Sequence, residues 1–109
     1  MRTGRICGAL VWVALAAGCA EDPRVAGIVA LEGDAANGEV LYGQECTTCH
    51  GADASGGSGP AIDHEHSAEQ AAQAILKGPF SMPSFADQFD DAEIADLIAH
   101  LRELGAVAP

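Results

Sequence analysis

The C-terminal third of the chain has the clearest pattern of apolar and polar positions. Its apolar side chains recur at the i, i+3, i+4, i+7 spacing of an amphipathic helix, in a stripe formed by Ile94, Leu97, Ile98, Leu101 and Leu104. Asp90 followed three residues later by Glu93 is a capping box, and Gly105 comes directly after the stripe. We therefore predict a helix that begins after Asp90 and ends at about Leu104.

Two earlier stretches carry helix signals as well. Ser67 with Gln70 is a second capping box, and it predicts a helix over 68–77 that ends at Gly78 and Pro79. Asp34 is a good N-cap for a helix that runs towards residue 45, and Gly38 within it suggests close approach by another element. The stretches 51–63 and 80–89 read as loops, so we predict an all-α domain of three to four helices.

The N-terminus has the composition of a secretory signal peptide. Residues 1–5 are short and positive, residues 6–17 form an apolar run, and the run is too short for a comfortable membrane span. Residues 15–19, Leu-Ala-Ala-Gly-Cys, resemble the lipobox of bacterial lipoproteins, although Ala16 stands where that family most often has Leu. The resemblance implies a signal peptide over 1–18 and a lipidated Cys19; ordinary cleavage or an uncleaved anchor are the alternatives.

After Cys19 we expect a flexible tether over 19–33 and a single domain over 34–109. The tether contains Pro23, Gly27 and Gly33 and has no clear period, although Ile28, Val29 and Leu31 could dock on the surface of the domain. With 109 residues the chain is long enough for one small domain.

The charge balance limits the choice of partners. Five Lys and Arg oppose 16 Asp and Glu, which gives a formal charge of −11. Nucleic acid is excluded as a partner because no basic patch is present to neutralise phosphates. A protein partner with a basic docking face is the natural complement, and a merely solubilising acidic surface is the alternative.

The strongest chemical signal is the pentapeptide Cys46-Thr47-Thr48-Cys49-His50. Two thiols at i and i+3 followed by an imidazole is the spacing of c-type haem attachment, in which the sulfurs form thioethers and the histidine binds the iron. A redox disulfide between the cysteines, or a zinc site with His64 and His66, are the competing interpretations. The scarcity of aromatic residues favours haem, because a buried apolar cofactor would enlarge a thin core.

Met82 is the candidate for the second axial ligand of the iron. It lies in a loop stiffened by Pro83, and a thioether favours Fe(II) and raises the reduction potential. His64 and His66 are the rival ligands, but their acidic neighbours favour a solvated loop. We expect His100, one turn from Leu97, to be a packing residue.

Residues 34–104 resemble a class I monohaem cytochrome c of the short bacterial type. The matching segments are 46–50, Gly59-Pro60, Met82-Pro83-Ser84-Phe85 and 90–104. The resemblance implies a small all-α fold around haem with one haem edge exposed. It also implies that the Pro60 carbonyl accepts a hydrogen bond from His50.

The family also crosses its first and last helices, through a glycine and an aromatic residue on one helix and a leucine and an aromatic residue on the other. Gly38, Tyr42 and Leu97 fit this pattern, whereas His100 stands where the family has an aromatic residue.

The expected function is single-electron transfer by one covalent haem c, with Cys46 and Cys49 as attachment points and His50 and Met82 as iron ligands. We expect a monomer, not an enzyme, that is lipid-anchored on the periplasmic side of a bacterial membrane (or soluble in the periplasm) and exchanges electrons with redox proteins. A peroxidase or gas sensor with a displaceable Met82, and a zinc-binding structural module, are the alternatives.

Overall fold

The computed structural model describes residues 21–62, 66–79 and 81–109. Within these ranges the chain forms five helices, α2 (Arg24–Val29), α3 (Ala35–Glu45), α4 (Thr47–His50), α5 (Ala68–Lys77) and α6 (Asp91–Glu103). The described residues contain no β-strand, and a parallel bridge joins His66 to Val107. The all-α class is confirmed, with more helices than the three to four expected because α2 and the one-turn α4 were not predicted separately. The predicted signal peptide, Cys19 and His64 lie outside the described residues.

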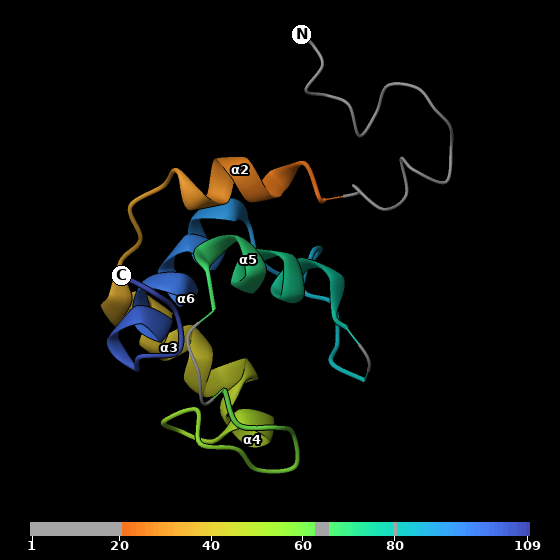
Figure 1. Ribbon diagram of the computed structural model, residues 1–109, viewed down its shortest axis with the longest axis vertical. Coiled ribbons are helices and arrows are strands. Elements are labelled where there is room, and N and C mark those ends of the chain that lie inside the picture. Colours follow the sequence, from red (N-terminus) through yellow and green to blue (C-terminus); the bar gives the residue numbers. More distant parts are fainter. Residues whose placement is uncertain (1–20, 63–65, 80) are drawn as a thin grey trace, which may run out of the picture.

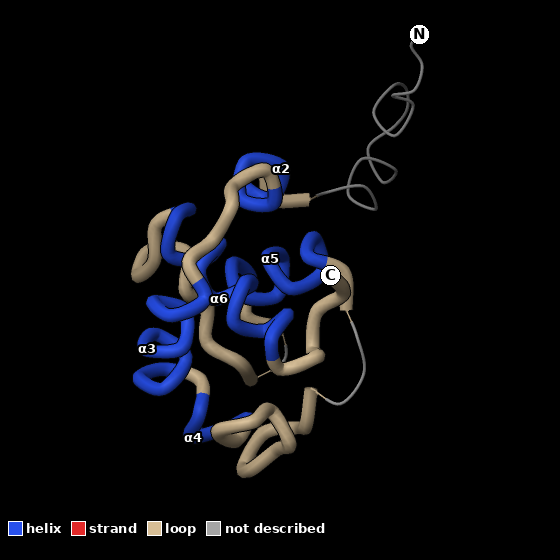
Figure 2. Tube along the Cα trace, turned by 90° about the vertical axis from the view of Figure 1, so that its left-hand side faces the viewer, coloured by secondary structure: helices blue, strands red, loops and turns tan. Residues whose placement is uncertain are grey.

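The helices pack in two groups around α6. α3 crosses α6 and makes the most extensive contact in the fold, whereas α2 and α5 pack against each other and against α6. Figure 1 shows α2 across one end of the folded part, above α5, and α4 at the opposite end. The turned view in Figure 2 also shows α2 at one end and α4, with the loop that follows it, at the other.

The helix ends agree with the capping signals in the sequence. The side chain of Asp34 accepts hydrogen bonds from the amides of Ala36 and Asn37, and the capping boxes of Ser67 and Asp90 are both formed. α5 ends at Gly78, which has the left-handed conformation (φ 66°) that glycine adopts without strain. These local signals therefore set the start of each long helix and the end of α5.

Backbone contact between α3 and α6 explains the glycine inside α3. A Cβ atom at Gly38 would overlap the carbonyl oxygen of Asp96, so a larger residue cannot be accommodated without separating the helices. The Asp96 carboxylate also accepts hydrogen bonds from the backbone N–H of Asp34 (2.7 Å) and from Nδ2 of Asn37 (2.8 Å). Asp96 thus tethers the first turn of α3 to α6, where a negative charge is favourable for the helix dipole.

His100 takes the place of an aromatic residue at this crossing. Its ring lies edge-on to Tyr42 with the ring centroids 5.3 Å apart, and its side chain is buried. The Nδ1 atom of His100 has no hydrogen-bond partner among the described residues. His100 is therefore a packing residue, as expected, and the helices meet closely despite the substitution for an aromatic.

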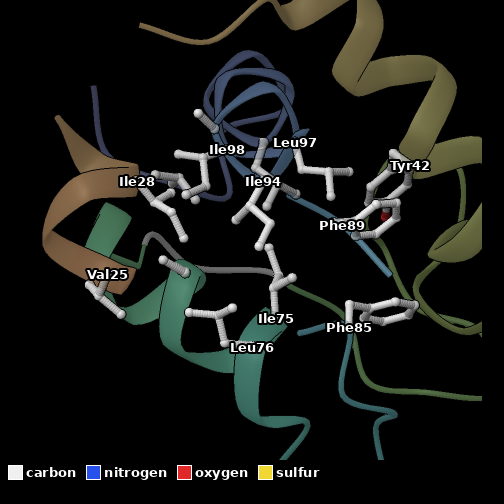
Figure 3. Close-up of a cluster of buried hydrophobic side chains, with 14 of the residues drawn as sticks. Val25, Ile28, Tyr42, Ile75, Leu76, Phe85, Phe89, Ile94, Leu97 and Ile98 are labelled. Atoms are coloured by element: carbon white, nitrogen blue, oxygen red, sulfur yellow. The ribbon is translucent and has the colours of Figure 1, made fainter. Parts of the chain in front are cut away.

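The sequence predicted a flexible tether over 19–33, but the structure forms the helix α2 within this range. Val25 and Ile28 are each 1% exposed, and Figure 3 shows Ile28 directed towards the cluster formed by α5 and α6. The sequence did not reveal this helix because six residues make fewer than two turns, too few for a helical period of apolar residues to be visible. The helix is stabilised by packing of its apolar face on α5 and α6. Residues 24–29 therefore belong to the folded domain and not to a tether.

The core is continuous across all the long helices. Figure 3 shows α2 side chains at one side of the cluster and Tyr42 with Phe89 at the other, with α5 and α6 side chains between them. The chain after α6 closes one edge of this core: Val107 is buried, and His66 exchanges backbone hydrogen bonds with Ala106 and Ala108. α6 is the central element, because every other long helix contacts it.

The two glycines of α3 give a matched test of the helix crossing. We expect Gly38→Ala to lower the free energy of unfolding by about 3 kcal/mol, because the added methyl group must separate α3 from α6. Gly43 has no atom within 4 Å of its position for a Cβ, so Gly43→Ala should raise stability by about 0.5–1 kcal/mol. Urea unfolding followed by circular dichroism measures both, and equal effects would contradict the close crossing.

Candidate functional site

The pentapeptide lies where α3 passes into α4. Cys46 lies between the two helices, as the C-cap of α3 and the N-cap of α4, and its N–H donates to the Tyr42 carbonyl (2.8 Å). The N–H groups of Cys49 and His50 both donate to the Cys46 carbonyl, at 3.3 and 2.9 Å. This turn brings Cys46 and Cys49 to the same side of the helix, because residues three apart are neighbours on a helix surface.

Both thiols are free in the structure. Cys49 is exposed and Cys46 is partly buried. Burial, and secondarily the nearby charge of Glu45, raises the pKa of the Cys46 thiol to about 11. Cysteines that catalyse disulfide exchange have lowered pKa values, so this environment does not favour the redox-disulfide interpretation.

The imidazole of His50 is oriented by a backbone carbonyl. Its Nδ1 atom lies 2.8 Å from the carbonyl oxygen of Pro60, which can only accept, so Nδ1 carries the proton. Nε2 then keeps its lone pair for a metal. The carbonyl also fixes the orientation of the ring, as partners of metal-binding histidines generally do. The structure therefore contains the contact that the family resemblance implied for Pro60.

The loop after His50 folds back on α4 and brings Pro60 to the histidine. Gly59 donates to the Cys49 carbonyl (2.8 Å), and Gly56 donates to the His50 carbonyl (2.6 Å). A Cβ atom at Gly59 would lie 3.1 Å from the Cβ atom of Cys49, so the loop approaches the motif closely. The glycine-rich composition of the loop is explained by this approach.

Tyr42 is a site residue whose hydroxyl contact the sequence did not reveal. Its hydroxyl donates to the Gly51 carbonyl (2.7 Å), so one side chain joins the helix crossing to the residue next to His50. Burial, with smaller contributions from Cys46 and Asp53, raises the pKa of Tyr42 to about 12. The sequence placed Tyr42 on the correct helix face, but only the fold brings a loop carbonyl to it.

Met82 lies in the loop between α5 and α6. Its side chain is partly buried against the core, and its N–H donates to the Pro79 carbonyl (3.0 Å). The loop packs tightly on itself, since a Cβ atom at Gly78 would lie 2.6 Å from the Met82 carbonyl oxygen. The methionine is thus held in a folded loop.

The rival histidine His66 lies elsewhere in the described part of the chain. It is fixed by backbone hydrogen bonds to the segment after α6, and His64 lies outside the described residues. Across residues 21–62, 66–79 and 81–109, no group of three or more His, Cys, Asp and Glu side chains is placed to hold a metal ion. In the same ranges, no helix has the length and apolar character needed to cross a membrane.

The donor atoms fit a haem attached through two thioethers. Two free thiols lie one turn apart, and the imidazole next to them has its proton held on Nδ1 by Pro60. The neutral thioether of Met82 is partly buried against the core, between α5 and α6. The two thiols and the adjacent imidazole are the groups that attachment of a c-type haem requires.

Comparison with known proteins points to the same cofactor. Residues 33–101 match the family described as cytochrome c oxidase, cbb3-type, subunit III. A cytochrome c-553-like protein of Synechocystis is 32% identical over 87 residues, which cover 76% of this chain and 81% of that protein. The chain also aligns with a dihydro-heme d1 dehydrogenase of Pseudomonas aeruginosa at 43% identity over 81 residues, 69% of this chain but 16% of the dehydrogenase.

The fold is shared with a solved cytochrome. The crystal structure of cytochrome cL from Hyphomicrobium denitrificans superposes with a TM-score of 0.57 at 24% sequence identity. The alignment covers 74% of this chain and 51% of that cytochrome. This similarity shows a common helical architecture.

The contact between Tyr42 and Gly51 predicts that Tyr42→Phe is less stable than the unchanged protein at pH 8 and more stable at pH 12. At pH 8 we expect Tyr42→Phe to be less stable than the unchanged protein by about 1 kcal/mol, because the Gly51 carbonyl loses its donor. The folded-state pKa of about 12 lies above the ordinary value of 10, so the tyrosine's contribution is complete below pH 10 and is lost as the pH rises towards 12.

That loss amounts to about 2 kcal/mol at pH 12, which would leave the phenylalanine variant the more stable of the two. Urea unfolding of both proteins from pH 8 to pH 12 measures the difference. A constant difference across that range would contradict the raised pKa.

Proposed function

The chain belongs to the cytochrome c family represented by subunit III of the cbb3-type cytochrome c oxidase, and we propose that it is a single-electron carrier. Its cofactor is a covalently bound haem c, which when bound supplies a one-electron Fe(II)/Fe(III) couple. In this proposal Cys46 and Cys49 hold the haem, while His50 and Met82 bind the iron. The observation that carries it is the 2.8 Å contact between His50 Nδ1 and Pro60, beside two free thiols.

His50 and Pro60 act together in this proposal. The Pro60 carbonyl holds the proton on Nδ1, which keeps Nε2 available as a ligand and fixes the plane of the ring. Tyr42 supports the same arrangement, because its hydroxyl bond to Gly51 restrains the start of the loop that carries Pro60. A rigid ligand set changes little when the iron changes its oxidation state, and this favours electron transfer.

Met82 closes the sixth position of the iron in this proposal. A thioether is soft and neutral, so it stabilises Fe(II) and raises the potential relative to a second imidazole. Support comes from the folded loop around Met82 and from its contact with the core. With both axial positions held by the protein, no coordination site remains for a substrate, which argues for a carrier and against an enzyme.

Two alternative functions are a haem-based peroxidase or gas sensor and a zinc-binding structural module. A peroxidase or gas sensor would require Met82 to leave the iron, and rapid carbon monoxide binding by the reduced protein would favour it. The name of the Pseudomonas relative suggests a dehydrogenase, but this chain aligns with 16% of that protein. A zinc-binding module would need Cys46 and Cys49, which the haem already uses.

We propose export and lipid anchoring at Cys19, on the periplasmic side of a bacterial membrane. Support comes from the signal-peptide composition of residues 1–18 and from the position of α2. The folded part begins at Arg24, so the chain from Cys19 spans at most roughly 18 Å. Such a short linker would keep the monomeric domain close to the lipid surface, and a soluble periplasmic protein is the alternative.

We propose redox proteins with a basic docking face as the partners. All 16 Asp and Glu follow the proposed signal peptide, and their excess over Lys and Arg provides long-range attraction that speeds encounter at low ionic strength. Contacts of this kind are small and short-lived, which suits a carrier that must dissociate after each electron.

Replacing Met82 by Ala tests the ligand assignment. We expect the midpoint potential to fall by ~0.1 V or more, because axial ligands set haem potentials over a range of ~0.8 V. The reduced variant should also bind carbon monoxide rapidly, since its sixth position is open. His66→Ala is the control and should leave both properties unchanged. A lower potential in His66→Ala, together with an unchanged potential in Met82→Ala, would assign the ligand to His66.

Replacing Cys19 by Ser tests the anchor. In a bacterial host that lipidates exported proteins, we expect the unchanged protein in the membrane fraction and the variant in the soluble periplasmic fraction. The intact mass should show acyl chains in addition to haem on the unchanged protein. A mass without acyl chains would favour ordinary cleavage of the signal peptide.

A further inference from the structure

Arg24, the first residue of α2, is bonded to the chain between Met82 and α6. Its Nε donates to the Asp91 carboxylate (2.7 Å), Nη1 to the Ala86 carbonyl (2.7 Å) and Nη2 to the Phe89 carbonyl (2.9 Å). One guanidinium thus satisfies two loop carbonyls and joins them to the first residue of α6. Arginine suits this role because its planar group presents several donors in a fixed geometry.

The other side of the same loop is attached to α5. The N–H of Phe85 donates to the Ile75 carbonyl (2.9 Å), and the hydroxyl of Ser84 donates to the Leu76 carbonyl (2.6 Å). The residues that follow Met82 are therefore held by α5 and by Arg24. Without Arg24, the part from Ala86 to Phe89 would lose its bonds to α2.

α2 itself is firmly placed, so Arg24 is a fixed attachment point. Val25 and Ile28 are buried, and the N–H of Asp22 donates to Oε1 of Gln73 in α5 (3.0 Å). The Asp22 carboxylate in turn accepts from the N–H of Arg24 (2.9 Å). Arg24 also precedes residues 33–101, the segment that matches the family, so this attachment is additional to the matched part.

We propose that Arg24 is a positioning residue for Met82, keeping the loop in the conformation that holds the thioether on the iron. This inference rests on the proposed ligation by Met82. The carbonyl bonds matter more than the charge, because the Arg24 and Asp91 side chains are 30% and 45% exposed and such ion pairs contribute little. Loss of Arg24 increases the fraction of molecules with an open loop, and the apparent affinity for an external ligand rises in proportion.

The test uses the full-length, haem-loaded protein and imidazole as the external ligand. Imidazole affinity of the ferric form is measured by absorption, together with the weak long-wavelength band of a thioether bound to ferric haem and the midpoint potential. We expect Arg24→Ala to bind imidazole about tenfold more tightly and to have a lower potential. Arg24→Lys should recover little of this, because a single ammonium cannot replace the three-way contact.

Two controls separate positioning from general destabilisation. Arg102→Ala removes an arginine that also donates to a backbone carbonyl, that of Ala108 (3.1 Å), and should leave imidazole affinity unchanged. Val107→Ala removes methyl groups from the core beyond α6 and lowers global stability. If Val107→Ala raised imidazole affinity as much as Arg24→Ala at an equal loss of stability, the inference would be overturned.

The remaining outcomes are also decisive. An unchanged imidazole affinity in Arg24→Ala, with the thioether band present in the unmodified protein, would overturn the role of Arg24 alone. A missing thioether band in the unmodified protein would overturn Met82 ligation and this inference with it. If Arg24→Ala fails to load haem, Arg24→Gln keeps one amide donor and should show a smaller shift in the same direction.

Discussion

The close contact between α3 and α6 at Gly38 is the constraint on which the rest of the structure depends. The glycine lets the two backbones meet, and the Asp96 carboxylate holds the first turn of α3 in place. Because α3 continues into Cys46 and then α4, this crossing sets the direction in which the pentapeptide leaves the core. Tyr42, one turn beyond Gly38, carries the same restraint to the loop that positions Pro60.

The two proposed iron ligands are held by different parts of the fold. His50 depends on the loop that folds back onto α4, through backbone hydrogen bonds and close glycine contacts. Met82 depends on the loop between α5 and α6, which is attached to α5 and, through Arg24, to α2. In Figure 1 α2 and α4 lie at opposite ends of the folded part, so the elements that restrain the two proposed ligands lie far apart. This division means that either ligand can be perturbed separately.

Much of the fold could be predicted because its signals are local. Capping by Asp34, Ser67 and Asp90 depends on residues within one turn, and the all-α class followed from such signals and from the stripe on α6. The expected tether over 19–33 was wrong for α2, because Val25 and Ile28 are too few to show a period. Their burial depends on surfaces of α5 and α6 that are distant in the sequence.

For the site, residue type and spacing within five positions identified two thiols and an imidazole, and membership of the family identified the cofactor as haem c. The sequence also identified Pro60 as a partner of His50 through the family resemblance. The tertiary structure decided the contacts across long separations, such as Tyr42 with Gly51, Asp96 with Asp34 and Arg24 with Ala86. A hydrogen bond between distant residues depends on how helices pack, and no periodicity or spacing along the chain encodes that geometry.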